Sequence, residues 1–196
     1  MVAGAVGLDD AQEAGGTGEL DDVTLVSRAR DGDAHAYEQL VLRHQGPIFR
    51  LAVRMLGSRA DAEDVTQEVF VGVWQRLGQL RDDAAFTGWL YRAATNRCLN
   101  TLRSRRPVAD DEADQLPDRG PVGKPEREAE TSAQLAALRS ALRGLTPQQR
   151  ACWLLREVHG RSYEEIARAL GVTSATVRGR IARARAQLAE VMSPWR

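Results

Sequence analysis

Two segments with apolar residues at helical spacing are separated by a stretch that cannot fold on its own. Residues 107–130 contain four prolines, eight acidic and three basic residues, and few apolar side chains. Such a stretch buries too little apolar surface to offset the entropy lost on ordering. We therefore expect two small domains joined by a flexible acidic linker at 107–131. Residues 1–20, rich in Gly, Ala and acids, are expected to be a disordered tail.

The first domain is expected to span residues 21–106 and to be entirely helical, because its apolar residues recur every three or four positions. Gly46 and Pro47 are predicted to interrupt its second helix, with Pro47 in the first turn of the next one. Another helix is expected after Asp61. Its buried stripe is predicted to comprise Val65, Val69, Val73, Trp74 and Leu77.

The second domain is expected to span residues 132–192 and is also helical. Thr146 with Gln149, and Ser162 with Glu165, have the spacing of capping boxes that begin helices. The segment 162–188 reads as a helix-turn-helix, in which a glycine ends the first helix and the second buries Val177, Ile181 and Leu188. No segment has a clear strand pattern, so the predicted fold class is all-α.

The charge distribution indicates a nucleic-acid partner for this second domain. The chain has no net charge, yet residues 131–196 carry eleven basic and four acidic residues. Arginines on the outside of a second helix suit the major groove of DNA. The alternative is a solvated basic helix in a bundle. The outer residues are Ser174, Thr176, Arg178, Gly179, Arg180, Ala182, Arg183 and Arg185.

The helix after Asp61 carries a polar strip opposite its buried stripe. The strip consists of Asp64, Gln67, Glu68 and Val71, which share one helix face at i, i+3, i+4 and i+7. Three interpretations are open: a docking face for a protein partner, a solvated acidic face, or a metal or acid–base site. Val71 on this strip favours docking. No serine nucleophile, histidine or glycine-rich phosphate loop lies nearby in the sequence.

A third candidate face lies on a helix expected from about Phe86 to Arg103. Tyr91 is predicted to be its exposed aromatic residue, whereas Phe86 and Trp89 are assigned to the core. Arginines, amides and one ring could hold unstacked bases while contacting phosphates. A solvated face is the alternative. The outward polar residues are Arg92, Asn96, Arg97, Asn100 and Arg103.

Other signals narrow the class of protein. Cys98 and Cys152 are isolated and are expected to be reduced thiols of a cytoplasmic protein. The three histidines form no metal-ligand pattern, and we expect no cofactor or metal. The N-terminus does not resemble a signal peptide, and no apolar run is long enough for membrane insertion.

The chain resembles bacterial RNA polymerase sigma factors of the extracytoplasmic-function (ECF, group IV) sigma-70 family. The segments DAEDVTQEVFVGVW, FTGWLYRAATNRCLNTLRSRR and LTPQQRACWLLREVHGRSYEEIARALGVTSATVRGRIARARAQL resemble region 2.2, regions 2.3–2.4 and region 4 of that family, in the same order. The resemblance implies a non-catalytic subunit that binds core RNA polymerase, recognises the −10 and −35 promoter elements and promotes DNA melting. It also implies an anti-sigma factor as partner, and a linker that threads a basic channel of the polymerase.

The resemblance assigns roles to the candidate faces. Asp64, Gln67 and Glu68 would contact the coiled coil of the largest polymerase subunit, and region 4 would hold the flap of the second-largest subunit. Arg178, Gly179, Ala182 and Arg183 would read the −35 element. A loop of Leu80, Arg81, Asp82, Asp83 and Ala84 would trap a flipped −10 base, with Asn96 and Asn100 nearby.

The sequence departs from the family at two reading positions. Many relatives have serine where this chain has Gly179, and aspartate where it has Asn100, so base preference at both positions stays open. Two other functions also stay open: a stand-alone helix-turn-helix regulator that binds DNA as a dimer, and a hydrolase whose metal is held by the carboxylates between Asp61 and Glu68.

Overall fold

The computed structural model describes residues 20–105, 125–191 and 193, and every regular element within these ranges is helical, which confirms the predicted all-α class. The first unit comprises α1 (Asp22–Arg30), α2 (Ala34–Leu56), α3 (Arg59–Arg76), the short 3-10 turns η1 (Leu77–Gln79) and η2 (Asp83–Ala85), and α4 (Phe86–Ser104). The second comprises α5 (Pro125–Gly144), α6 (Pro147–Trp153), the π turn η3 (Leu154–Val158), α7 (Tyr163–Leu170) and α8 (Ser174–Val191).

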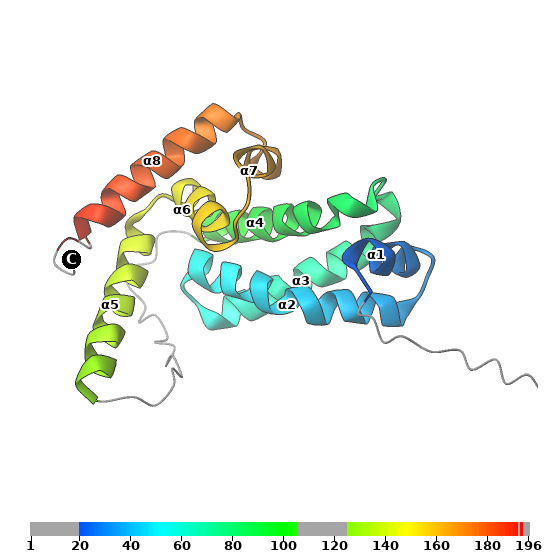
Figure 1. Ribbon diagram of the computed structural model, residues 1–196, viewed down its shortest axis with the longest axis horizontal. Coiled ribbons are helices and arrows are strands. Elements are labelled where there is room, and N and C mark those ends of the chain that lie inside the picture. The colour runs from blue at the N-terminus through cyan, green and yellow to red at the C-terminus, as the bar shows by residue number, and fades with distance from the viewer. Residues whose placement is uncertain (1–19, 106–124, 192, 194–196) are drawn as a thin grey trace, which may run out of the picture.

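Side-chain caps begin the helices of the first unit. The carboxylates of Asp21 and Asp33 accept backbone N–H bonds at the starts of α1 and α2, and the Ser58 hydroxyl does the same for α3. Helices α2, α3 and α4 lie side by side, with α1 across one end (Figure 1). Their shared core includes the fully buried side chains of Leu40, Ile48, Leu51, Met55, Phe86 and Leu90.

The predicted break at Gly46-Pro47 is wrong, because α2 runs through both residues as one helix. An internal proline removes one backbone hydrogen bond and costs about 3 kcal/mol. Ile48 and Leu51, just beyond it, are fully buried, and burial of such side chains contributes roughly 1.5–3 kcal/mol each. The free energy gained by burying these side chains therefore exceeds the cost of the proline. The apolar residues before and after Pro47 share one buried face only if the helix continues through it.

The predicted stripe of α3 needs one correction. Val65, Val69, Val73 and Leu77 are buried as expected, but Trp74 is 40% exposed, and Phe70 is buried in addition. The Trp74 ring lies at the edge of the core, where its centroid is 4.6 Å from that of Tyr37. The two ring planes are tilted by 47°, so the indole covers the Tyr37 ring at the surface instead of entering the core.

The second unit contains the predicted helix-turn-helix. Both capping boxes form, Thr146 with Gln149 and Ser162 with Glu165. Gly171 ends α7 in the left-handed conformation, with φ at 65°. The Thr173 hydroxyl accepts the backbone N–H of Thr176 at 3.2 Å and so caps α8. Val177, Ile181 and Leu188 face inward as predicted.

The two units pack against each other in what we call the closed arrangement, in which α4 contacts α6 and α7 (Figure 1). The predicted tail, except Leu20, lies outside the described residues, as do residues 107–124 of the predicted linker. Helix α5 begins at Pro125, within the end of the predicted linker. In the described ranges no helix has both the length and the apolar character needed to cross a membrane.

Candidate functional site

The polar strip on α3 is present as predicted. Asp64, Gln67 and Glu68 are exposed, and Val71 beside them is 50% exposed. Val65, Val69 and Val73 are buried in the core, so the strip lies on the opposite, exposed face of α3.

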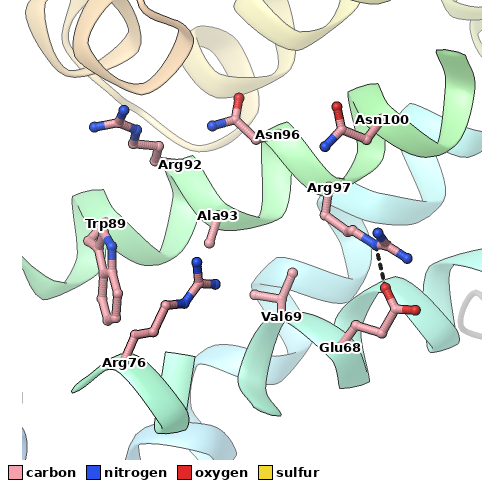
Figure 2. A pocket seen from close by; sticks show the side chains of 9 residues that line it. All are labelled: Glu68, Val69, Arg76, Trp89, Arg92, Ala93, Asn96, Arg97 and Asn100. Carbon is pink, nitrogen blue, oxygen red and sulfur yellow. Dashed lines mark ion pairs between the residues drawn. The ribbon is translucent and has the colours of Figure 1, made fainter. Parts of the chain in front are cut away.

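A polar pocket of about 410 Å³ lies between α3 and α4. Trp89 and Arg97 reach from α4 toward α3, whereas Arg92, Asn96 and Asn100 line the opposite edge of the pocket (Figure 2). Three arginines, two amides and one half-buried indole can together contact phosphates, base edges and a base face. The pocket is lined by Glu68, Val69, Arg76, Trp89, Arg92, Ala93, Asn96, Arg97 and Asn100.

Ion pairs connect the strip on α3 with the basic face of α4. The Glu68 carboxylate pairs with Arg97 (Figure 2), and Asp61 pairs with Arg105 near the other end of α3. The residues assigned by sequence to protein docking and to DNA binding are thus neighbours. A partner that takes up the Glu68 carboxylate would also free the Arg97 guanidinium.

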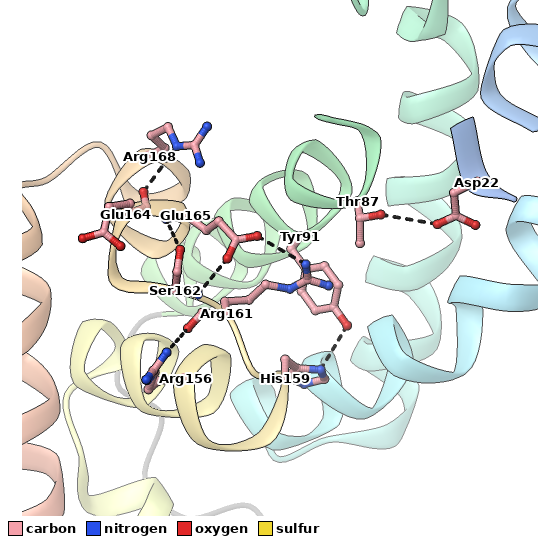
Figure 3. Close-up of polar contacts among 10 residues, drawn as sticks. All are labelled: Asp22, Thr87, Tyr91, Arg156, His159, Arg161, Ser162, Glu164, Glu165 and Arg168. Atoms are coloured by element: carbon pink, nitrogen blue, oxygen red, sulfur yellow. Dashed lines mark hydrogen bonds and ion pairs between the residues drawn. The ribbon is translucent and has the colours of Figure 1, made fainter. Parts of the chain in front are cut away.

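The prediction that Tyr91 is exposed is wrong, because this side chain is only 6% exposed. Its hydroxyl lies 3.1 Å from Nδ1 of His159, and the Arg161 guanidinium lies 4.3 Å from its ring centroid (Figure 3). The second unit covers this face of α4. Trp89, which the sequence assigns to the core, is instead half-buried, and it is the aromatic side chain that lines the pocket.

The other outward residues of α4 are as predicted. Arg92, Asn96, Arg97, Asn100 and Arg103 are all exposed. One helix thus presents a polar face to solvent, a second face to the core through Leu90 and Ala94, and a third to the second unit.

The predicted loop is formed by the segment that joins η1 to η2. Arg81, Asp82 and Ala84 are exposed, and Leu80 is half-buried. The Asp82 carboxylate accepts the backbone N–H of Ala84 at 3.1 Å. Asp83 points back to Arg30 of α1, so it is not available at the loop surface in the way that the sequence suggested.

Helix α8 presents its predicted outer face. Thr176, Arg178, Ala182, Arg183 and Arg185 are exposed, and Ser174, Gly179 and Arg180 are half-buried. Arg185 pairs with Glu157 of η3 at 2.6 Å, and Arg178 lies 5.4 Å from the ring centroid of Tyr163. These contacts hold two of the arginines near the surface of the helix.

Comparison with known proteins identifies both units. Residues 40–108 match the family model of Sigma-70 region 2, and residues 135–188 match that of Sigma-70 region 4. The RNA polymerase sigma-H factor of Pseudomonas aeruginosa is 37% identical over 185 residues, covering 88% of this chain and 94% of the relative. The chain belongs to the ECF sigma factors of the sigma-70 family.

Further relatives of this sigma factor agree. The ECF sigma factor SigM of Mycobacterium tuberculosis is 36% identical over 189 residues, covering 95% of this chain and 92% of the relative. The solved structure of CnrH in complex with the cytosolic domain of CnrY is 30% identical, with a TM-score of 0.66 over 88% of this chain and 97% of CnrH. RpoE of Bartonella quintana, solved with the anti-sigma factor NepR, is 21% identical and shares the fold, with a TM-score of 0.65.

Several polar residues that organise this sigma factor were not found from its sequence. Arg150 is buried at 6% exposure and donates to the carbonyl oxygens of Leu142 and Met55. Arg30 binds the loop before α4. Neither arginine is marked by its local sequence, because Leu80 and Asp83, which bind Arg30, and Met55, which binds Arg150, come from distant segments.

The structure does not support the metal-dependent hydrolase as an alternative function. Among the described residues, no group of three or more His, Cys, Asp and Glu side chains could hold a metal ion. Asp61 and Glu68 instead form ion pairs with arginines.

The two cysteines are buried and unpaired. Burial raises the pKa of the Cys98 thiol to about 12, which disfavours the reactive thiolate.

Proposed function

We propose that this sigma factor docks on core RNA polymerase through α3, recognises the −10 element through α4 and the loop before it, and recognises the −35 element through α8. It thereby directs the polymerase to specific promoters and promotes DNA melting. The observation that carries the proposal is the pairing of Glu68 with Arg97 across one pocket. A protein-docking strip and a DNA-binding face lie on adjacent helices, as a subunit that bridges polymerase and promoter requires.

The residue assignments follow the exposed faces. We assign polymerase docking to Asp64, Gln67, Glu68 and Val71, against the coiled coil of the largest subunit. The −10 element is assigned to Leu80, Arg81, Asp82, Ala84, Arg92, Asn96, Arg97, Asn100 and Arg103, with Trp89 replacing Tyr91 as the base-stacking ring. The −35 element is assigned to Ser174, Thr176, Arg178, Gly179, Ala182, Arg183 and Arg185, and the polymerase flap to the rest of region 4.

The closed arrangement has to open for this function. Helices α4 and α8 both pack on α6 and α7, and packed helix axes lie about 8–10 Å apart. Promoter elements two helical turns apart are separated by about 70 Å. The domains assigned to residues 21–106 and 132–192 would therefore separate on the polymerase, joined by the part of the predicted linker that precedes α5.

The proposal extends to partners and location. CnrH and RpoE were solved in complexes, one with CnrY and the other with an anti-sigma factor, and we propose an anti-sigma partner for this chain. Sigma factors act as subunits of another enzyme, so we assign no catalysis and no cofactor to this one. It would work in the cytoplasm, where polymerase and promoter DNA are found.

Binding to core polymerase tests the proposal against the stand-alone regulator. Reversal of two strip charges, Asp64→Lys with Glu68→Lys, should reduce retention of the sigma factor on immobilised core enzyme at least tenfold. The matched control is Glu38→Lys, an exposed acid on α2 outside the strip, which should bind like the parent. If the parent protein does not bind core enzyme but binds an operator as a dimer, the result would support the stand-alone helix-turn-helix regulator instead.

A further inference from the structure

Arg30, the last residue of α1, is bound to the loop before α4. Its Nη1 donates to the carbonyl oxygen of Leu80 at 3.1 Å and to Oδ1 of Asp83 at 2.6 Å. Its Nη2 lies 3.3 Å from Oδ2 of the same carboxylate. One guanidinium therefore holds both ends of the segment 80–83, in the two-pronged geometry that arginine can form and lysine cannot.

The other polar contacts of this loop are local. The Asp82 carboxylate accepts the backbone N–H of Ala84, the Leu80 N–H donates to the Leu77 carbonyl, and the Ala85 N–H donates to that of Asp82. These bonds shape the two short turns but do not fix one turn relative to the other. Arg30 does so, because α1 packs against both η1 and η2 and its side chain crosses between them.

The pair of Arg30 and Asp83 is less exposed than a comparable pair on the same helix. The side chain of Asp83 is 16% exposed and that of Arg30 is 31% exposed. By contrast, Arg28 on the same helix pairs with Asp33 at 52% and 29% exposure. Less exposed pairs are screened less by water and salt. The contact of Arg30 also joins residues 53 positions apart, so it restrains the loop from outside its own sequence.

We propose that Arg30 is a positioning residue for −10 recognition, and this rests on the proposed function. It holds the segment 80–84 in one shape, so that Arg81, Asp82 and Ala84 present their exposed groups to an unpaired base together. A loop that is ordered before binding loses less conformational entropy when the base enters. Arg30 also neutralises Asp83, whose free carboxylate would repel the phosphates of the promoter.

The shape effect and the charge effect can be separated by substitution. Arg30→Ala removes both. Arg30→Lys keeps a positive charge near Asp83 but loses the two-pronged contact. Arg30→Ala combined with Asp83→Asn removes the unpaired negative charge while the loop stays unrestrained. If Arg30 acts through positioning, the second and third variants should both stay impaired. The matched control is Arg28→Ala, which removes an arginine from the same helix without touching the loop.

The experiment is run-off transcription with core polymerase on a mapped promoter and on variants of it. Each −10 base and, separately, each −35 base is replaced, and discrimination is the ratio of initiation rates between original and replaced promoter. We expect Arg30→Ala to reduce discrimination at one or two adjacent −10 positions at least tenfold and to leave −35 discrimination within twofold. Arg28→Ala should match the parent at both elements.

Two controls keep the outcomes distinct. Retention on core enzyme and the thermal melt of each variant show whether it is folded, and Arg30→Lys serves if Arg30→Ala does not fold. A folded Arg30→Ala protein with parental −10 discrimination would overturn the inference, as would full rescue by Asp83→Asn, which would leave only a charge effect. If the parent protein itself initiates no transcription with core enzyme, the proposed function has failed.

Discussion

The hydroxyl of Tyr91 lies 3.1 Å from Nδ1 of His159, and this contact joins the first unit to the second (Figure 3). Tyr91 belongs to α4, next to the residues assigned to the −10 element, and His159 follows η3, just before the helix-turn-helix. The rings meet edge to face at 5.2 Å between centroids. Arg150, which donates to the Met55 carbonyl oxygen, and Arg161, which lies over the Tyr91 ring, also join the two units. The contact between Tyr91 and His159 can nevertheless be removed by deleting one hydroxyl, so it can be used to test whether the closed arrangement is present.

Tyr91→Phe should weaken the closed arrangement without unfolding either unit. The substitution keeps the ring but leaves Nδ1 of His159 without its partner, which costs roughly 1–3 kcal/mol when the group is buried. Small-angle X-ray scattering should then show a larger radius of gyration than for the parent, with unchanged helical circular dichroism. Thr101→Val, which removes a hydroxyl that bonds only within α4, should leave the radius unchanged.

The burial of His159 at this interface should make the closed arrangement sensitive to acid. Burial, and then the nearby charges of Arg54, Arg161 and Arg50, lower the pKa of His159 from 6.5 to about 4. Between these values an opened or unfolded chain binds a proton that the closed one does not. The stability of the closed arrangement should therefore be constant above pH 6.5 and fall as pH drops from 6.5 toward 4.

Scattering at a series of pH values measures this effect. The radius of gyration should rise between pH 6.5 and 4 in the parent protein. In His159→Gln, which retains a polar partner for Tyr91 but does not titrate, the rise should be absent from that window. An equal rise in both proteins would assign the pH dependence to other groups and contradict the account.

Arg150 should be among the most costly arginines to replace. It is 6% exposed and its guanidinium donates to the carbonyl oxygens of Leu142 at 2.7 Å and Arg143 at 2.8 Å. Burial is the main reason that its pKa is lowered. Arg150→Ala leaves buried carbonyl oxygens unpaired, and we expect a loss of about 3 kcal/mol in the free energy of unfolding. Arg168→Ala, on an exposed helix face, should change it by less than about 0.5 kcal/mol.

Two glycines of the helix-turn-helix should respond to alanine with opposite sign. Gly179 lies inside α8, and a methyl group there would meet no atom within 4 Å, so Gly179→Ala should raise stability by roughly 1 kcal/mol. Gly171 has φ at 65°, where alanine is strained, so Gly171→Ala should lower it by roughly 1 kcal/mol or more. Urea unfolding curves of the two variants measure the difference, and equal effects would contradict the assigned backbone.

Local signals in the sequence were sufficient for several elements. The helix predicted from about Phe86 to Arg103 is α4, Phe86–Ser104, and both capping boxes form as predicted. These features depend on residues within one or two turns of each other. For the same reason the outer face of α8 was predicted correctly, since one apolar stripe fixes which side of a helix is exposed.

Errors occurred where distant residues decide the outcome. Periodicity places Tyr91 on the side of α4 away from the core, but it cannot show that a second unit covers that side. The local preference of Pro47 predicts a helix start, but buried residues on both sides of it, His44 and Ile48, keep α2 continuous. Arg30 is bound by groups 50 and 53 residues away, and Arg150 is bound by Met55, 95 residues away, in addition to carbonyl oxygens near the end of α5. Sequence spacing carries no information about such partners.

Run-off transcription with purified core polymerase tests the central claim most directly, because it requires docking, promoter recognition and melting in one assay. With the sigma factor added, transcripts should start at one defined position, and replacement of either the −10 or the −35 element should reduce them at least tenfold. Core enzyme alone should give no such start. If the chain instead binds a DNA site tightly by itself and leaves the starts of core enzyme unchanged, the account is contradicted.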